Sequence, residues 1–164
     1  MKTKLTPTQN SLREPVRRAM IELLNQQLAD VLDLGQQAKQ AHWNVKGPHF
    51  IGLHELFDKV AEQLEEFSDD IAERAVELGG VALGTIQIIS EKSRLSTYPL
   101  DLASGQKHVA ALSGALAQFG TTTRAAINTA AKAGDADTAD LFTEVSRGVD
   151  KLLWFVEAHR QAKE

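Results

Sequence analysis

Apolar residues recur every three or four positions along most of the chain, the spacing that places them on one face of an α-helix. Four segments carry this pattern, and it predicts long helices over about residues 15–45, 50–78, 104–133 and 136–160. Pro15 suits the first turn of the first helix, and Gly47-Pro48 ends it, because proline disfavours helical geometry at the residue before it. Gly79-Gly80 ends the second helix. No alternation typical of strands competes with these helices, so the expected fold class is all-α.

The connections between the predicted helices differ in length. Short turns join the first helix to the second and the third to the fourth, so each pair forms antiparallel neighbours. Residues 81–103 form a long crossover between the pairs and carry a short helix near 85–89. Short loop, long crossover and short loop are typical of a ferritin-like four-helix bundle with up-down-down-up helices. We expect residues 15–164 to form this bundle and residues 1–14 to form a flexible N-terminal tail.

Composition narrows the range of possible functions. The chain has 164 residues and no cysteine, which excludes a disulfide framework, a thiolate nucleophile and an iron–sulfur cluster. Its longest apolar stretches are shorter than the roughly 18 residues that a membrane-spanning helix needs, and no apolar signal segment opens the chain. We therefore expect one cytoplasmic domain with no membrane partner. The net charge of −4 argues against nucleic-acid binding by the whole surface.

An acidic run lies on the second predicted helix, where residues 62–77 contain seven acidic residues and one basic residue, Arg74. The seven acids are Glu62, Glu65, Glu66, Asp69, Asp70, Glu73 and Glu77. Several of them are four positions apart, and like charges at that spacing mildly destabilise a helix unless a cation intervenes. A solvated outer face is the simplest interpretation of such a run. A metal site is the alternative, because histidines lie nearby.

Two histidines flank the first turn. His42 precedes the turn and His54 follows it, so the hairpin brings both imidazoles to about the same height. Asp69 and Glu73 are one helical turn apart and can present two carboxylates to a single ion. His54 and Asp69 share a side of the helix, but about 22 Å of helix rise separates them, whereas ligand bonds are about 2 Å long. A two-fold axis between them would pair histidines of one subunit with carboxylates of the other, so any such site is expected to lie between subunits.

The other common form of iron site is disfavoured. A di-iron centre inside one four-helix bundle needs Glu-x-x-His on two helices. None of the five histidines has a glutamate three positions before it. His49, His108 and His159 also lack partners at ligand spacing, and we expect them to be ordinary surface histidines. We expect Trp154 to pack in the core.

Six stretches of sequence carry a specific signature. They read KQAHWNVKG (39–47), LHE (53–55), DDIAERAVELGGVALGT (69–85), YPLD (98–101), DTAD (137–140) and DKLLWF (150–155). Together with the spacing His-x11-His-x14-Asp-x3-Glu, they resemble the Dps family, the DNA-protecting mini-ferritins of bacteria. The resemblance covers about residues 20–158.

The resemblance implies a homo-dodecamer with tetrahedral symmetry around a cavity, and a ferroxidase site across each two-fold interface. At the matching positions the family's iron ligands, which are also the catalytic residues, are His42 and His54 of one subunit with Asp69 and Glu73 of its neighbour. The protein would be a ferroxidase that oxidises Fe(II), mostly with hydrogen peroxide, stores the Fe(III) mineral and thereby protects DNA. Imidazole and carboxylate ligands also suit Zn(II) or Mn(II). Because the ligands must be deprotonated, iron uptake should weaken as the pH falls.

Two other functions remain open at this point. One is a nucleoid-associated, DNA-binding architectural protein whose metal site is not catalytic, and the other is a helical shell with structural Zn(II) at the same ligands. Residues 1–18 carry a net charge of +4, from Lys2, Lys4, Arg13, Arg17 and Arg18 against Glu14. Tails repeated around a shell could bind DNA by avidity, and we expect weak, salt-sensitive binding at best.

Three further features have two interpretations each. The acids Asp135, Asp137, Asp140 and Glu144 open the last helix, where capping and the helix dipole explain the first two, while the resemblance implies iron-entry pores at three-fold axes. Asp58 either orients His54, holds a second iron through water, or is a surface acid. Trp43 either donates electrons during iron oxidation or packs at a subunit contact, and we favour packing.

Overall fold

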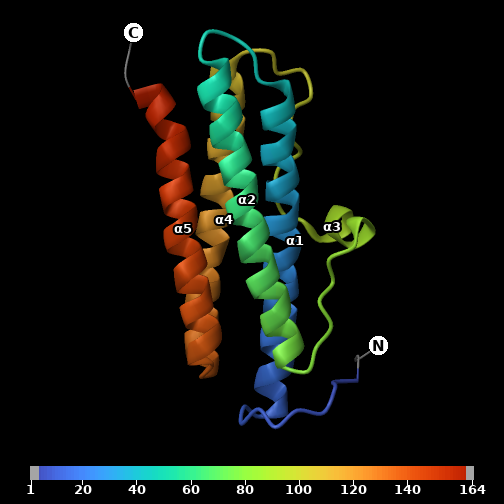
Figure 1. Cartoon of the computed structure of the whole chain (residues 1–164). Coiled ribbons are helices and arrows are strands. Elements are labelled where there is room, and N and C mark those ends of the chain that lie inside the picture. The colour runs from blue at the N-terminus through green and yellow to red at the C-terminus, as the bar shows by residue number, and fades with distance from the viewer. Residues whose placement is uncertain (1–3, 162–164) are drawn as a thin grey trace.

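The computed structural model describes residues 4–161, which contain helices and no strand (Figure 1). The helices are α1 (Glu14–Asn44), α2 (Phe50–Glu77), α3 (Ile86–Lys92), α4 (Gly105–Ala133) and α5 (Ala136–Gln161). The four long helices run up, down, down and up, and α3 lies beside α1 in the crossover. Each end of a long helix lies within one residue of its predicted position, so the all-α class and the predicted connectivity are confirmed.

A side-chain cap and two glycines explain where several of the helices start and stop. The Ser104 side chain accepts a hydrogen bond from the Lys107 amide and so caps the N-terminus of α4. Gly134 ends α4 in the left-handed conformation, with a φ of 81°. Gly79 follows α2 with a φ of 87°, and a Cβ there would lie 2.6 Å from the Thr6 carbonyl oxygen. Only glycine meets both requirements without strain.

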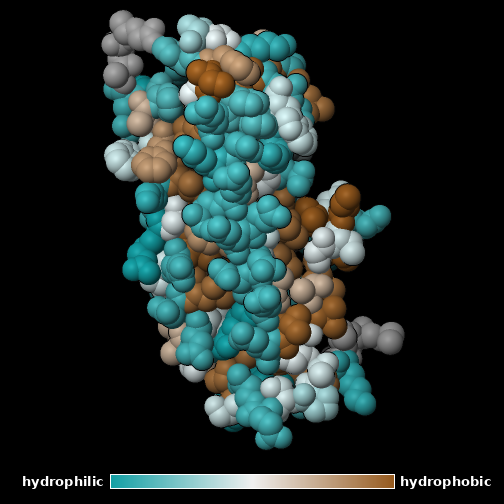
Figure 2. Space-filling view, viewed as in Figure 1, coloured by the Kyte–Doolittle hydropathy of each residue, from teal (hydrophilic) through white to brown (hydrophobic). Residues whose placement is uncertain are grey.

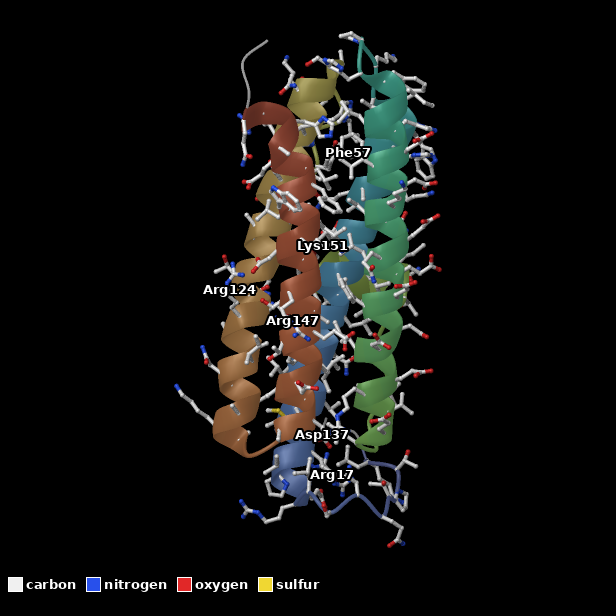
Figure 3. All side chains as sticks on the ribbon, turned by 60° about the vertical axis from the view of Figure 1, so that its left-hand side comes forward. Arg17, Phe57, Arg124, Asp137, Arg147 and Lys151 are labelled. Atoms are coloured by element: carbon white, nitrogen blue, oxygen red, sulfur yellow. The ribbon has the colours of Figure 1, made fainter. Side chains whose placement is uncertain are left out.

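Each long helix turns an apolar side inward and a polar side outward. Figure 2 shows the polar side of α2 as a hydrophilic band along the molecule. The core lies between the four long helices, and its largest fully buried side chains include Phe57, Phe119 and Phe142. Figure 3 shows Phe57 pointing from α2 into the bundle. Gly148 on α5 lets the Phe67 ring approach, because a Cβ there would lie 2.3 Å from the Phe67 Cζ atom.

The crossover is fixed to α1 by buried polar side chains. Asp30 is fully buried, and its carboxylate accepts hydrogen bonds from the Arg94 backbone amide (2.9 Å) and from Arg94 Nε (3.0 Å). Gln37, also buried, donates to the Ser96 carbonyl oxygen (3.1 Å). These contacts give a defined path to a segment that lacks regular structure over much of its length.

The segment before α1 contacts the residues that follow the C-terminus of α2. The Thr6 amide donates to the Gly79 carbonyl oxygen (2.8 Å), while Leu5 and Leu12 pack against the core. The first three residues lie outside the described part of the chain. The flexibility expected for residues 1–14 stays a prediction, and these contacts show where the segment is attached.

Several large apolar side chains are exposed on the single chain. Trp154 is 60% exposed, so the expectation that it packs in this chain's core is wrong. Leu152 and Val156 occupy the buried side of α5, and Trp154 lies about 200° around the helix from Leu152. Trp43 is 63% exposed, and its packing against another subunit stays a prediction. Among residues 4–161, no helix has both the length and the apolar character needed to cross a membrane.

Candidate functional site

The α1–α2 hairpin brings His42 and His54 together, at the same level of the bundle. Their rings stack, with centroids 3.7 Å apart and planes 21° from parallel. His42 Nδ1 lies 2.8 Å from the His54 carbonyl oxygen, and His54 Nδ1 lies 2.8 Å from the His42 carbonyl oxygen. A carbonyl oxygen can only accept, so each neutral ring carries its hydrogen on Nδ1 and a lone pair on Nε2. The hairpin therefore prepares both imidazoles to bind a metal ion through Nε2.

An ion pair lies beside the two histidines. Lys39 Nζ is 2.5 Å from Asp58 Oδ1, and the same oxygen is 3.9 Å from His42 Nδ1. The hydrogen bond from Lys39 lowers the pKa of the Asp58 carboxyl, so this group stays ionised. The ion pair places Asp58 beside His42, and the three interpretations of Asp58 given above stay predictions. No role was predicted for Lys39 from the sequence, although its place one turn before His42 could have indicated that it lies beside the histidine pair.

The carboxylates of α2 occupy its outer face. All seven acids of the run are exposed, and they lie along the hydrophilic band in Figure 2. Asp69 and Glu73 are among them, one turn apart and directed away from the core. Within residues 4–161, no group of three or more histidines and acids is close enough to hold one metal ion. The structure thus joins the two histidines and leaves the two carboxylates at a different level of the same helix.

Arg74, the one base in the acidic run, joins α2 to the start of α5. Its guanidinium donates to Thr138 Oγ1 (3.0 Å) and pairs with Asp135 (3.0 Å) and Glu77 (2.9 Å). Burial opposes its charge, but the hydrogen bond to Glu77 and the charge of Asp135 raise the pKa of Arg74. Arg74 therefore forms structural ion pairs between α2 and the start of α5 and within α2.

The acids at the start of α5 divide into two kinds. Asp135 is buried and caps the helix, because its Oδ1 accepts from the Thr138 amide (3.0 Å). Its side chain is therefore not placed to line a pore. Asp137, Asp140 and Glu144 are exposed, and Figure 3 shows Asp137 at the end of the bundle where α5 begins. A pore formed by these three with other subunits stays a prediction.

One buried histidine was misassigned from the sequence. His108 is 1% exposed, and its Nδ1 lies 2.7 Å from the Tyr98 hydroxyl oxygen. The expectation of a surface histidine is wrong for this residue, whereas His49 and His159 are exposed as expected. His108 lies four positions before the buried Leu112, on the apolar stripe of α4, and this position was the available signal.

Comparisons with known proteins agree on one family. Residues 21–163 match the sequence model of the ferritin-like domain. A DNA protection during starvation protein from Agrobacterium fabrum is 46% identical over 160 residues, which is 98% of this chain and 99% of that protein.

Solved structures extend the similarity to the whole fold. The tetragonal form of Mycobacterium smegmatis Dps aligns with a TM-score of 0.90 at 31% identity, covering 99% of this chain and 96% of that one. DpsA14 from Streptomyces coelicolor aligns with a TM-score of 0.91 at 34% identity, covering 98% of this chain and 96% of that one. The ferritin-like four-helix bundle predicted from the sequence is confirmed.

Proposed function

Because this chain belongs to the ferritin-like Dps family, we propose that it is a cytoplasmic ferroxidase that stores iron. It oxidises Fe(II) with hydrogen peroxide at sites shared between two subunits and keeps the Fe(III) mineral inside a homo-dodecameric shell. Removing both reactants suppresses the hydroxyl radicals that would attack DNA. His42 and His54 of one subunit and Asp69 and Glu73 of its neighbour hold the iron.

The arrangement of the two histidines carries this proposal. Both Nδ1 atoms are held by backbone carbonyls, which leaves two Nε2 lone pairs beside each other at one end of α2. Asp69 and Glu73 are exposed on the same helix, with Asp69 about 22 Å and Glu73 about 28 Å beyond His54. Two α2 helices packed antiparallel about a two-fold axis bring each histidine pair to the partner's carboxylates, which forms two sites per pair of subunits.

The ligand chemistry suits iron oxidation. Hydrogen peroxide takes two electrons and two protons to become two water molecules, and two Fe(II) ions supply the electrons. Neutral imidazoles bind Fe(II), while carboxylates stabilise the higher charge of Fe(III). Two imidazoles and two carboxylates leave coordination positions open for the oxidant. The same ligands accept Mn(II) or Zn(II), and Zn(II) has no redox chemistry with which to complete this reaction.

Iron oxidation can be tested by adding Fe(II) without oxygen, then hydrogen peroxide, and following ferric absorbance and peroxide consumption. We expect the wild type to consume about one peroxide per two Fe(II), and His54→Ala to react at least about 10-fold more slowly, because one ligand is missing. His159→Ala is the matched control, since this histidine is exposed on α5 and should leave the rate unchanged. Light scattering verifies that all shells assemble. A wild type that binds Zn(II) but consumes no peroxide would support a structural zinc shell instead.

DNA binding is the alternative function and has its own test. Lys4 and Arg13 are exposed before and at the start of the bundle, while Lys2 lies outside the described residues. We expect the assembled protein to retard plasmid DNA weakly at low salt and not at about 150 mM salt, because few phosphate contacts are available. Deleting residues 1–12 should remove the retardation and leave iron oxidation intact. Free migration of the plasmid even at low salt would contradict DNA binding and a location on the nucleoid.

A further inference from the structure

A buried tyrosine–histidine pair lies outside the proposed iron ligands. Tyr98, the single tyrosine of the chain, is 8% exposed in the crossover, and His108 is 1% exposed in the first turn of α4. The Tyr98 hydroxyl oxygen is 2.7 Å from His108 Nδ1, and the two ring planes are 22° from parallel with their centroids 6.1 Å apart. Both groups are ionisable, and neither has a part in the iron oxidation described above.

The surroundings determine which atom carries each proton. Burial raises the pKa of Tyr98 to about 12, and burial also lowers the pKa of His108, so both groups are neutral near pH 7. The backbone of Leu102 and of Asn44 lies beside the imidazole and favours its protonated form, although no described residue makes a well-formed hydrogen bond to Nε2. A phenol is a stronger acid than a neutral imidazole, and an imidazole nitrogen is a stronger base than a phenol oxygen, so Tyr98 is the donor and the ring hydrogen of His108 is on Nε2. Nδ1 then has a lone pair, which accepts the hydrogen bond from the Tyr98 hydroxyl.

The pair lies next to the helix end that carries the proposed iron ligands. The Gly105 amide, three residues before His108, donates to the Lys46 carbonyl oxygen (3.1 Å), and α1 ends two residues before Lys46, at Asn44. His42 is in the same helical turn, two residues earlier, and its carbonyl oxygen holds the ring of His54. A short path through the end of α1 therefore connects the Tyr98–His108 pair to the histidine pair.

We propose that Tyr98 donates an electron to the iron site and that His108 accepts the phenol proton. This role rests on the proposed iron oxidation and applies when a site holds a single Fe(II). The Fe(II) gives one electron to hydrogen peroxide and becomes Fe(III). Tyr98 gives the second electron and becomes a neutral tyrosyl radical, its proton moves to His108 Nδ1, and peroxide leaves as two hydroxide ions. A later Fe(II) returns the electron to Tyr98, and His108 returns the proton.

This electron source protects the shell from damage. One Fe(II) alone can reduce peroxide only to hydroxide and a hydroxyl radical, whereas Fe(II) and Tyr98 together supply the two electrons that reduce it to two hydroxide ions. An oxidised phenol must lose its proton, and in a buried site it needs an acceptor already in contact. His108 supplies that acceptor at 2.7 Å, and the carbonyl groups beside its ring stabilise the charge that it gains.

The test loads one Fe(II) per site, adds hydrogen peroxide, and follows radicals by freeze-quench electron paramagnetic resonance alongside ferric absorbance. A tyrosyl signal can be assigned at once, because the chain has one tyrosine. We expect the signal in the wild type, none in Tyr98→Phe, and formation about 100-fold slower in His108→Phe, which lacks the proton acceptor. Spin-trapped hydroxyl radical should rise in Tyr98→Phe. The control Trp154→Phe replaces an exposed ring and should keep the signal.

The outcomes separate this inference from the function on which it rests. Fast ferric formation in the wild type with no tyrosyl signal would overturn the role of Tyr98 and leave the ferroxidase standing. Ferric formation no faster than in His54→Ala would remove both. If His108→Phe does not fold, wild-type protein with 15N-labelled histidine still tests the proton acceptor. A tyrosyl radical that is hydrogen-bonded to protonated His108 shows a hyperfine coupling to the histidine nitrogen. The absence of that coupling would overturn the role of His108.

Discussion

Shells assembled from a mixture of His42→Ala and Asp69→Ala subunits are expected to oxidise Fe(II), although shells of either variant alone are nearly inactive. Each variant alone lacks a ligand at every site. When the two variants pair about a two-fold axis, one of their two sites combines intact histidines with intact carboxylates. Random pairing makes half of the pairs mixed, so about a quarter of the wild-type activity should return. The initial rate of ferric absorbance after peroxide addition measures this recovery.

The matched control mixes His42→Ala with His54→Ala. Both substitutions lie on the histidine side, so every site in a mixed pair has one damaged histidine set and no activity should return. Mass spectrometry of the intact shells verifies that both subunits are present. Recovery in the control mixture, or none in the first mixture, would mean that the histidines and the carboxylates do not share an iron across the interface.

The second large effect concerns stability. We expect Asp30→Ala to lower the free energy of unfolding by about 3 kcal/mol, because it leaves the Arg94 amide and guanidinium without their buried acceptor. Asp30 is fully buried and holds the crossover against α1 through these two donors. For a chain of this size the melting temperature should fall by about 10 °C. Melting is followed by circular dichroism at one protein concentration, because assembly adds to the apparent stability.

Glu22→Ala is the control for this substitution. Glu22 lies on the same helix but is exposed, and removing its carboxylate should change the stability by no more than about 0.5 kcal/mol. Arg94→Ala should destabilise at least as much as Asp30→Ala, since it leaves a buried carboxylate without its counter-ion. Equal melting temperatures for Asp30→Ala and Glu22→Ala would show that the crossover is held by other contacts.

Local sequence patterns were enough to predict that the two histidines of the candidate site lie together. The heights of His42 and His54 follow from their distances to one tight turn, so their proximity needed no knowledge of the rest of the fold. Asp69 and Glu73 were placed by the rise of a single helix, which also predicted that they cannot meet these histidines within one chain. Their meeting across an interface stays a prediction.

The tertiary structure decided the properties that depend on contacts between distant segments. The ion pair of Lys39 with Asp58 and the buried contact of Tyr98 with His108 join different elements, and helical periodicity does not report such contacts. Polarity also misled the prediction for His108, because a histidine on an apolar stripe is buried when a neighbouring segment supplies a partner.

The sequence by itself determined the all-α class, the helix ends, the long crossover and the level of each candidate ligand, because these depend on residues close together in the chain. Only the tertiary structure decided which ring nitrogen of His42 and His54 is free, because backbone carbonyls across the hairpin hold the other one. It also decided the path of the crossover, since a buried carboxylate such as Asp30 becomes an anchor only when a donor from a distant segment reaches it.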